Sequence, residues 1–307
     1  MKQVAVTGAS GFIGQRLCRH LLSQGIAVRI LIRDASRAAN LGLVGAQLVD
    51  GSLTHYDSLK ALVQGVDAIV HAAGAVRGNS EAPFLAVNSG GTANLLRAVA
   101  EVTPDAHLLL ISSLAAREPD LSWYAHSKRE AERLLEASSL RYTILRPPAV
   151  YGPGDAEMRA IFDSMARGFA PVPGLTEART SLIHVDDLVT AIEACLRTQS
   201  TIGQRYELGD GHPSGYSWQD LADIAANVFS RRVHLLVIPT WLLNSIAAVN
   251  LAFSRLLRRP AMLTPPKLRE LRHSDWSTSN TQITAATGWQ PAVGLESGLS
   301  ALYQTAQ

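Results

Sequence analysis

The sequence has little of what would mark a disulfide-rich, metal-binding or nucleic-acid-binding protein. Only two of its 307 residues are cysteines, Cys18 and Cys195, which lie far apart in two segments of helical pattern. This spacing fits neither a disulfide framework nor a zinc site, so we expect two small buried side chains. The formal net charge is only +2, and Lys and Arg are scattered along the chain. We therefore expect no nucleic-acid partner.

Targeting and linker signals are also sparse. The start, MKQVAVTGAS, leaves about five residues before a glycine turn, too few for a secretory signal, so we expect a cytoplasmic protein. No repeat, flexible linker or low-complexity segment divides the chain. With 47% hydrophobic residues it can bury a large core. One large domain, or two closely packed lobes, is the expected organisation.

Short aliphatic runs alternate with helical patterns through the first half of the chain. Continuous apolar strands are typical of a parallel sheet that helices cover on both faces. The alternation predicts an α/β fold of the Rossmann type, a doubly wound parallel sheet. After residue 150, loops rich in Gly and Pro predominate, so we expect a Rossmann domain at 1–150 and a smaller substrate-binding lobe at 151–307, interleaved with it. The predicted strands are residues 3–7, 28–32, 46–49, 67–71, 107–112 and 142–146.

A glycine turn directly follows the first predicted strand and precedes a helix. It reads TGASGFIG, and its three glycines are three residues apart. The first permits a tight turn, the second lets the backbone approach a pyrophosphate, and the third lets helix and strand pack closely. The N–H groups at the helix start supply partial positive charge for phosphates. The residues of this predicted dinucleotide site are Thr7, Gly8, Ser10, Gly11, Phe12, Ile13 and Gly14.

Tyr124 and Lys128 form a second candidate site. They are four residues apart in WYAHSKREAERLLEA, which reads as a helix, so both side chains project from one face. An ammonium beside a phenol favours the phenolate, and we expect the pKa of Tyr124 to fall from about 10 towards working pH. Tyr124 can then donate or accept a proton at a substrate oxygen.

A series of motifs in consistent order resembles the extended branch of the short-chain dehydrogenase/reductase superfamily, the NAD-dependent epimerase/dehydratase family. The likeness covers essentially the whole chain, and is nearest to the 3β-hydroxysteroid dehydrogenase and dihydroflavonol reductase side of that branch. The run from Ser113 to Tyr124 is short, and it lacks the insertion common in sugar-nucleotide enzymes. The motifs are TGASGFIG (7–14), HAAG (71–74), VNSGGTANLL (87–96), ISS (111–113), YAHSK (124–128), RPPAVYGPGD (146–155), SLIHVDDLVTAI (181–192) and GWQP (288–291).

The resemblance implies a role for individual residues. Ser113, with Ser112 as the fallback, would hydrogen-bond the substrate oxygen, and Lys128 would also bind the nicotinamide ribose. Asn88 resembles the structural and proton-relay asparagine of the family. Asp186 or Asp187 is expected to cap a helix. Further residues expected to line the cofactor are Ser52, Leu53, Ala72, Ala73, Gly74, Pro147, Pro148, Ala149 and Val150.

The end of the second predicted strand bears on the choice of dinucleotide. An acidic residue there holds the ribose 2′-hydroxyl of NAD, whereas arginine accommodates the 2′-phosphate of NADP. Here the strand runs into Arg33, with Asp34 next and Arg37 close behind. We expect NADP(H), and NAD(H) bound through Asp34 is the alternative.

Residues 235–257 form the most apolar segment, and Arg258 and Arg259 follow it. Pro239, two asparagines and an arginine argue against a spanning helix. A buried helix or a lid over a lipophilic substrate is the first expectation, and peripheral membrane contact is the second.

The combined features predict an oxidoreductase that transfers a hydride between a nicotinamide cofactor and a hydroxyl or keto group. The substrate is expected to be a small molecule, hydrophobic or cyclic. The alternative within the family is a nucleotide-sugar epimerase or dehydratase. An alternative of another class is an NADP(H)-binding sensor or assembly protein without catalysis. A homodimer is an open expectation, because helix pairs often form dimers in this superfamily.

Overall fold

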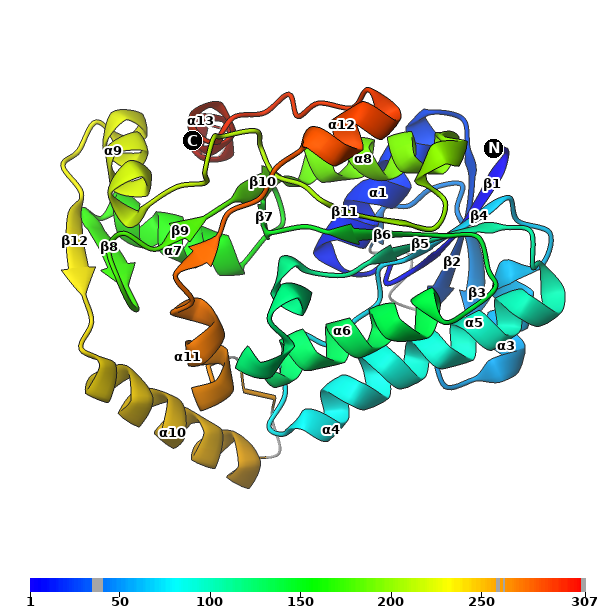
Figure 1. Cartoon of the computed structure of the whole chain (residues 1–307), viewed down its shortest axis with the longest axis horizontal. Helices are drawn as coiled ribbons and strands as arrows, with labels where there is room; N and C mark the ends of the chain where they lie inside the picture. Colours follow the sequence, from blue (N-terminus) through cyan, green and yellow to red (C-terminus); the bar gives the residue numbers. More distant parts are fainter. Residues whose placement is uncertain (35–40, 258–259, 262, 305–307) are drawn as a thin grey trace.

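A seven-stranded parallel sheet forms the centre of the structure (Figure 1). The computed structural model describes residues 1–34, 41–257, 260–261 and 263–304, so Arg37, Arg258 and Arg259 lie outside the described residues. The strand order β11-β6-β5-β4-β1-β2-β3 places β1 between β2 and β4, at the point where the sheet grows in opposite directions. Ligands of open α/β sheets bind at such a point. The strands are β1 (Gln3–Thr7), β2 (Ala27–Ile32), β3 (Gln47–Asp50), β4 (Ala68–His71), β5 (His107–Ile111), β6 (Tyr142–Arg146) and β11 (Gln204–Glu207).

The predicted Rossmann fold is confirmed, and six of the strands lie within one residue of their expected bounds. β11 was not expected because its sequence, QRYE, has no apolar run. It lies at the edge of the sheet, pairs only with β6, and buries only Tyr206. An edge strand with one buried residue gives too weak a pattern to recognise.

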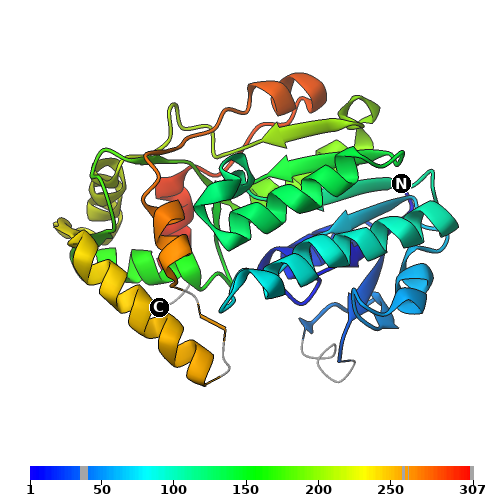
Figure 2. The ribbon, with the colours of Figure 1, turned by 60° about the horizontal axis from the view of Figure 1, so that its bottom comes forward.

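Helices cover both faces of the sheet (Figures 1 and 2). One hydrophobic core lies beneath α1 (Phe12–Ser23), α8 (Val185–Arg197) and α12 (Thr281–Thr287). The other lies beneath α3 (Tyr56–Val63), α5 (Gly91–Val102) and α6 (Trp123–Glu136). Cys18 and Cys195 are both buried in the first core, as expected. α8 and β11 come from the second half of the chain, yet they belong to these layers.

The remaining elements form a lobe beside the carboxyl ends of the strands. A third core joins α7 (Glu157–Ala166), α9 (Trp218–Phe229) and α13 (Leu295–Gln304). Three two-stranded sheets pair β10 (Leu182–His184) with β7 (Ala149–Tyr151), β12 (His234–Val237) with β8 (Phe169–Val172), and β13 (Asp275–Trp276) with β9 (Arg179–Thr180). Short helical turns are α4 (Glu81–Phe84), η2 (Leu85–Gly90), η3 (Leu114–Arg117), η4 (Pro119–Leu121) and η5 (Gln199–Thr201).

The structure of the apolar segment at 235–257 contradicts one of the expectations for it, a buried helix. Its start forms β12, and α10 (Thr240–Leu256) follows and packs on α11 (Pro265–Leu271) through a small cluster of apolar side chains. Only Leu243, Ala247 and Ser254 of α10 are buried, so the prediction of a buried helix is wrong. Among the described residues, no helix is long and apolar enough to cross a membrane.

The start of α8 also differs from prediction. Asp186 and Asp187 do not cap it, because the His184 ring accepts the first amide bond, from Asp186 N at 3.3 Å. Asp186 pairs instead with Arg16 on α1. Both oxygens of Asp187 accept backbone amides, from Ala292 and Val293, at 2.9 Å. The two carboxylates thus join distant segments rather than end their own helix.

Candidate active site

The glycine turn has the geometry of a phosphate cradle. Gly8 has φ +75°, and a Cβ there would come within 2.8 Å of the backbone of Ala72 and Ala73. A Cβ at Gly14 would overlap the Gly8 carbonyl at 2.1 Å, so neither position admits a side chain. Gly11 N donates to Gly8 O at 2.9 Å and closes the turn. No side chain caps α1 and its first turn has no acidic residue, so its positive end fits an anionic diphosphate.

The other predicted residues of the turn surround this cradle. Thr7 is buried at the end of β1, and Ser10 is exposed at the tip. Ile13 packs against the core under α1. The Phe12 ring lies beside Gly154 of the RPPAVYGPGD motif. A Cβ placed on Gly154 would be 3.6 Å from Cδ2 of that ring. The turn is therefore in contact with the loop after β7.

Arg33 and Ser52 follow adjacent strands, because Ile32 and Asp50 are partners in the register of β2 and β3. Arg33 is exposed there. The Ser52 hydroxyl hydrogen-bonds that of Thr54 at 2.9 Å, within its own turn. Asn94 donates to Leu53 O at 2.9 Å and holds this loop against α5. These residues lie at the sheet edge where the adenosine half of a dinucleotide is expected.

Asn88 joins three segments around the loop after β4. Its side chain accepts from Ala75 N at 2.7 Å, and donates to Ala75 O at 3.1 Å and to Ser127 Oγ at 2.8 Å. It lies in η2, a π-helical turn, a feature frequent at functional sites. A Cβ at Gly74 would be 3.2 Å from Asn88 Oδ1 and 3.4 Å from Lys128 Nζ. The glycine therefore lets the loop pass close to both side chains.

His71 is the centre of a chain of buried hydrogen bonds. The Thr92 hydroxyl donates its one proton to Asn88 O at 2.5 Å. Its oxygen therefore accepts the hydrogen bond from His71 Nε2 at 3.0 Å. His71 Nδ1 then accepts from the Thr7 hydroxyl at 2.6 Å. Burial, aided by the charge of Lys128, lowers the pKa of His71 to about 3 and keeps the ring neutral. This chain of hydrogen bonds joins the ends of β1 and β4 to η2.

Ser113, Tyr124 and Lys128 meet at the carboxyl end of β5. Lys128 Nζ donates to Ile111 O at 2.7 Å, and the Ser113 hydroxyl is a hydrogen-bond partner of the Tyr124 phenol. Ser113 also accepts from Ala115 N and begins η3. Its neighbour Ser112 points elsewhere, donating to Glu132 Oε1 at 2.6 Å in the interior. Ser113 therefore contacts the Tyr124 phenol, whereas Ser112, the fallback, contacts Glu132.

The electrostatics differ from prediction at Tyr124. Burial raises the pKa of its phenol above the usual value, Ser113 opposes the rise, and Glu270 and Glu157 add to it. The expected lowering is therefore wrong for this structure, because loss of solvation outweighs the hydrogen bond from Ser113, which is the contact that lowers the pKa. Burial also lowers the pKa of Lys128 to about 8, although Glu132 acts against this. The site holds a protonated phenol beside a readily deprotonated ammonium.

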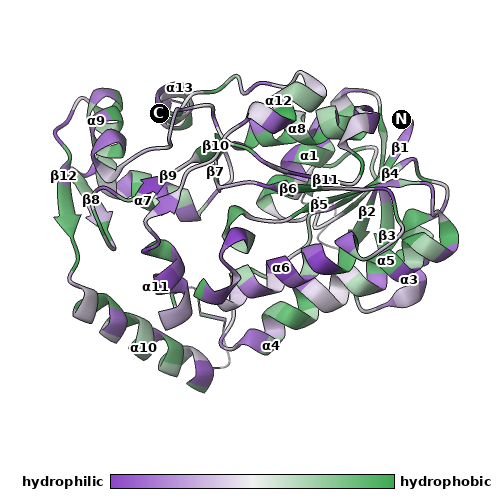
Figure 3. Ribbon diagram, viewed as in Figure 1, coloured by the Kyte–Doolittle hydropathy of each residue, from purple (hydrophilic) through white to green (hydrophobic). Residues whose placement is uncertain are grey.

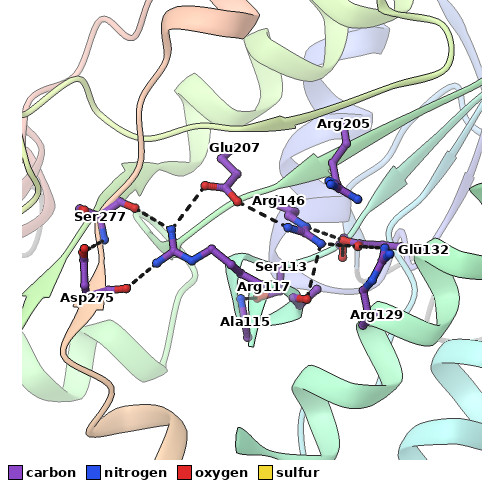
Figure 4. Close-up of polar contacts among 12 residues, drawn as sticks. Ser113, Ala115, Arg117, Arg129, Glu132, Arg146, Arg205, Glu207, Asp275 and Ser277 are labelled. Atoms are coloured by element: carbon purple, nitrogen blue, oxygen red, sulfur yellow. Dashed lines mark hydrogen bonds and ion pairs between the residues drawn. The ribbon is translucent and has the colours of Figure 1, made fainter. Parts of the chain in front are cut away.

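A buried carboxylate fixes the helix that carries Tyr124 and Lys128 (Figure 4). Glu132, on α6, is fully buried and accepts two bonds from Arg146, at 2.8 and 2.6 Å. Burial alone would raise the pKa of Glu132, but Arg146, Ser112 and Arg129 outweigh it and lower the pKa. Arg146 directly precedes Pro147, whose carbonyl accepts from Leu114 N at 2.9 Å. The pair thus connects α6 to Pro147 and Pro148 and to the start of β7, which contains Ala149 and Val150.

The same network reaches the second lobe. Glu207 on β11 lies 3.5 Å from Arg146 Nη1 and 3.6 Å from Arg117 Nη1. Arg117 donates to the carbonyls of Asp275 and Ser277, just after α11 (Figure 4). Ser122 and Lys267 both hydrogen-bond the Glu270 carboxylate on α11, each at 2.5 Å. The position of α11 over the site therefore depends on charged contacts.

A small cleft opens beside Tyr124 between the two lobes. Its apolar lining comes from the loop after β4, from α4 and from the segment leading to α11. The Phe84 and Tyr124 rings meet edge to face, with their centroids 6.4 Å apart. Lys267 Nζ lies 5.2 Å from the centroid of the Tyr124 ring. The residues around it are Val76, Gly78, Phe84, Ser122, Trp123, Tyr124, Ala261, Thr264, Pro266 and Lys267.

The model of the NAD-dependent epimerase/dehydratase family matches residues 4–209, and the chain belongs to this family. It is 36% identical over 301 residues to the ceramide reductase of Caulobacter vibrioides, covering 97% of this chain and 92% of that protein. It is 30% identical over 229 residues to the 4-hydroxy-2-methyl-3-oxo-4-farnesyl-3,4-dihydroquinoline-1-oxide ketoreductase of Stigmatella aurantiaca, covering 68% of each.

Among solved structures, the fold resembles UDP-glucuronic acid 4-epimerase from Bacillus cereus, in complex with UDP-glucuronic acid and NAD. The TM-score is 0.74 at 21% identity, over 99% of this chain and 98% of that one. The chain is an NAD(P)-dependent oxidoreductase of the extended short-chain dehydrogenase type, and it takes a nicotinamide cofactor. The glycine turn, which admits no side chain at Gly8 or Gly14, fits that cofactor.

Replacing Glu132 tests the buried network. Glu132→Gln removes the buried carboxylate that accepts two bonds from Arg146 and leaves Arg146 with the longer contact to Glu207, so we expect a loss of about 3–5 kcal/mol in the free energy of unfolding. Glu130→Gln on the same helix is the control, since Glu130 pairs with an exposed Arg133 and should cost under about 1 kcal/mol. Urea denaturation measures both. Equal losses in the two variants would show that the buried pair does not stabilise the fold.

The two serines should respond differently to alanine. Ser113→Ala removes a hydroxyl partner of Tyr124 and the cap of η3, and we expect kcat to fall about 10²–10³-fold with a loss of only about 1 kcal/mol in stability. Ser112→Ala removes a donor to the buried Glu132, and should cost about 1–3 kcal/mol of stability while turnover is retained. Kinetics and thermal unfolding of both proteins separate these effects. The opposite pattern would make Ser112 the substrate-facing serine.

Proposed function

We propose that the chain is an NADP(H)-dependent reductase of a keto group carried by a lipid with long alkyl chains. The observation that carries this is the position of Tyr124, the hydrogen-bond partner of Ser113, beside a cleft with a largely apolar lining. Val76, Phe84 and Pro266 suit alkyl groups, and the charge of Lys267, which also lines the cleft, is paired with Glu270. Residues 151–307 would then act as the substrate-binding lobe.

The chemistry of the proposal uses the groups at the end of β5. When bound, the nicotinamide cofactor supplies the hydride that a carbonyl reduction requires. Tyr124 donates its phenolic proton to the carbonyl oxygen, and its raised pKa keeps that proton available at neutral pH. Ser113 donates a hydrogen bond to the same oxygen as negative charge develops on it. Lys128 holds the ribose hydroxyls, and Asn88 keeps the loop after β4 in place.

The NADP(H) preference rests on Arg33. The guanidinium is exposed at the carboxyl end of β2, next to the loop after β3. Arginine forms forked hydrogen bonds with a phosphate, so it suits the 2′-phosphate of NADP(H). The glycine turn would hold the diphosphate. Ser52 and Leu53 would border the adenine, and Ala72, Ala73, Gly74, Pro147, Ala149 and Val150 would border the nicotinamide half.

The lipid class rests on the relatives as well as on the cleft. The ceramide reductase is named for a lipid with two long chains, and the Stigmatella ketoreductase for an oxo compound with a farnesyl group. Both names join a reduction to an extended apolar substituent. Similarity to the first runs along almost the whole of both chains, including the lobe that forms the cleft.

Turnover with a keto lipid tests the proposed function. Oxidation of NADPH should follow addition of a β-keto amide lipid with long chains, and NADPH should bind more tightly than NADH. Tyr124→Phe should lower kcat at least about 10²-fold, since only the proton donor is lost, with NADPH affinity unchanged. Turnover of Tyr124→Phe at the wild-type rate would remove this acid role. Stabilisation by UDP-sugars, without turnover of keto lipids, would favour an epimerase instead.

The pH profile should report on Lys128. Its pKa is lowered to about 8, so the ammonium predominates below pH 8 and is lost as the pH rises through that value. We expect kcat/KM to fall about tenfold per pH unit above 8, because the neutral amine no longer holds its partners as a cation. The phenol of Tyr124 stays protonated over this range. Lys60→Met, on α3, is a control that should keep this decline, and a flat profile up to pH 10 would show that the charge of Lys128 is not required.

A further inference from the structure

α10 carries a continuous apolar stripe on its outer side. The stripe consists of Leu242, Ile246, Val249, Phe253 and Leu256, spaced alternately four and three residues apart, so they share one face of the helix. Phe253 is 59% and Leu256 77% exposed. Trp241, at the start of the helix, is 70% exposed. α10 lies along the lower edge of the molecule in Figure 1 and comes forward in Figure 2, and Figure 3 shows hydrophobic and polar residues alternating along it.

The opposite side of α10 is firmly attached to the protein. Leu243 and Ala247 pack on Leu268 of α11. Arg272 donates to Asn244 Oδ1 and to Thr240 O, both at 3.2 Å, and holds the start of the helix. Asn250 donates to Leu263 O at 2.9 Å. The outer stripe is therefore a fixed surface of the fold and not a core face that has turned outward.

The sequence around this stripe is strongly basic. Residues 231–272 hold eight Lys and Arg and a single acidic residue, a net charge of +7, whereas the whole chain has +2. The rest of the chain is therefore acidic on balance, at −5. The one acidic residue, Glu270, is buried and hydrogen-bonded to Ser122 and Lys267. Positive charge thus collects in the segment that exposes the apolar stripe.

We propose that the outer face of α10 docks on the surface of an anionic lipid bilayer. An amphipathic helix with basic flanks binds such a surface through its apolar face and through attraction to anionic headgroups. Tryptophan at the end of the helix suits the boundary between headgroups and acyl chains. A second copy of the chain is a poorer occupant, because a symmetric contact would bring one +7 segment against another. An anionic bilayer supplies both the apolar contact and the opposite charge.

Hydrogen bonds join the end of α10 to residues that border the cleft at Tyr124. Asn79 donates to Ser254 O near the end of α10 at 3.1 Å, and accepts from Ala261 N at 2.8 Å. Ala261 O in turn accepts from Gly78 N at 3.2 Å, and both residues border the cleft. Docking would therefore place the cleft next to the lipid surface. That a keto lipid enters the cleft from the bilayer rests on the proposed function, whereas docking itself does not.

Vesicle sedimentation tests the docking with the full chain. The wild type should sediment with vesicles of equal parts phosphatidylglycerol and phosphatidylcholine, and much less with pure phosphatidylcholine or at high salt. Ile246→Ser with Phe253→Ser should weaken this binding about tenfold or more. The matched control is Val44→Ser with Leu48→Ser, which removes two exposed apolar side chains from the Rossmann half and should bind as the wild type does. Both double variants should keep the wild-type rate on a short water-soluble ketone, since neither touches Tyr124.

Three results would overturn the docking: no binding of the wild type to anionic vesicles, equal binding of the α10 double variant, or a dimer in solution that the α10 substitutions disrupt. The last would assign the stripe to a second copy of the chain. The keto-lipid assay is read separately. Binding without turnover of any keto lipid would keep the docking and reject the proposed substrate. Turnover of a detergent-dispersed keto lipid by a protein that does not bind vesicles would keep the proposed substrate and reject the docking.

Discussion

The pair between Glu132 and Arg146 is the constraint on which the arrangement of the site depends. A fully buried carboxylate is costly unless its lone pairs are bonded, and here Arg146, Arg129 and Ser112 satisfy them. One partner stands on the helix of Tyr124 and Lys128, and the other on the strand that leads into Pro147. Since the pair cannot separate without leaving a buried charge, the helix, the end of β5 and the loop after β6 keep one relative position (Figure 4).

Hydrogen bonds between neutral groups hold the ends of β1 and β4 against η2. The bonds from Thr7 through His71 and Thr92 to Asn88 all run in one direction, because each hydroxyl has a single proton to give. Burial and the charge of Lys128 lower the pKa of His71 and keep the ring neutral, so that His71 Nδ1 stays an acceptor for the Thr7 hydroxyl. The loop at Gly74 is thus held by Asn88, within contact distance of Lys128. The charged and the neutral networks meet at this loop.

The near-neutral composition of the chain conceals an uneven distribution of charge. A segment of net +7 surrounds the exposed stripe of α10, and the remaining residues are acidic on balance. The most apolar part of the sequence is therefore not the core. Its inner residues make only a small cluster with α11, which suffices to orient the helix. Together with Asn79, this attachment links a surface helix to the cleft beside Tyr124.

The sequence alone determined the sheet strands that are continuously apolar, the glycine turn and the shared face of Tyr124 and Lys128, because these depend on neighbours within a few residues. It could not predict β11, an edge strand with one buried residue. It favoured Ser113 over Ser112 by family resemblance, but it could not show where either side chain points. The direction of the pKa shift at Tyr124, the cap of α8 by His184 and the exposure of α10 were decided by the tertiary structure. The pKa of Tyr124 depends on burial and on Glu270, over a hundred residues away, and the exposure of α10 depends on how it packs on α11. The cap depends on the orientation of the His184 ring, which no local pattern encodes.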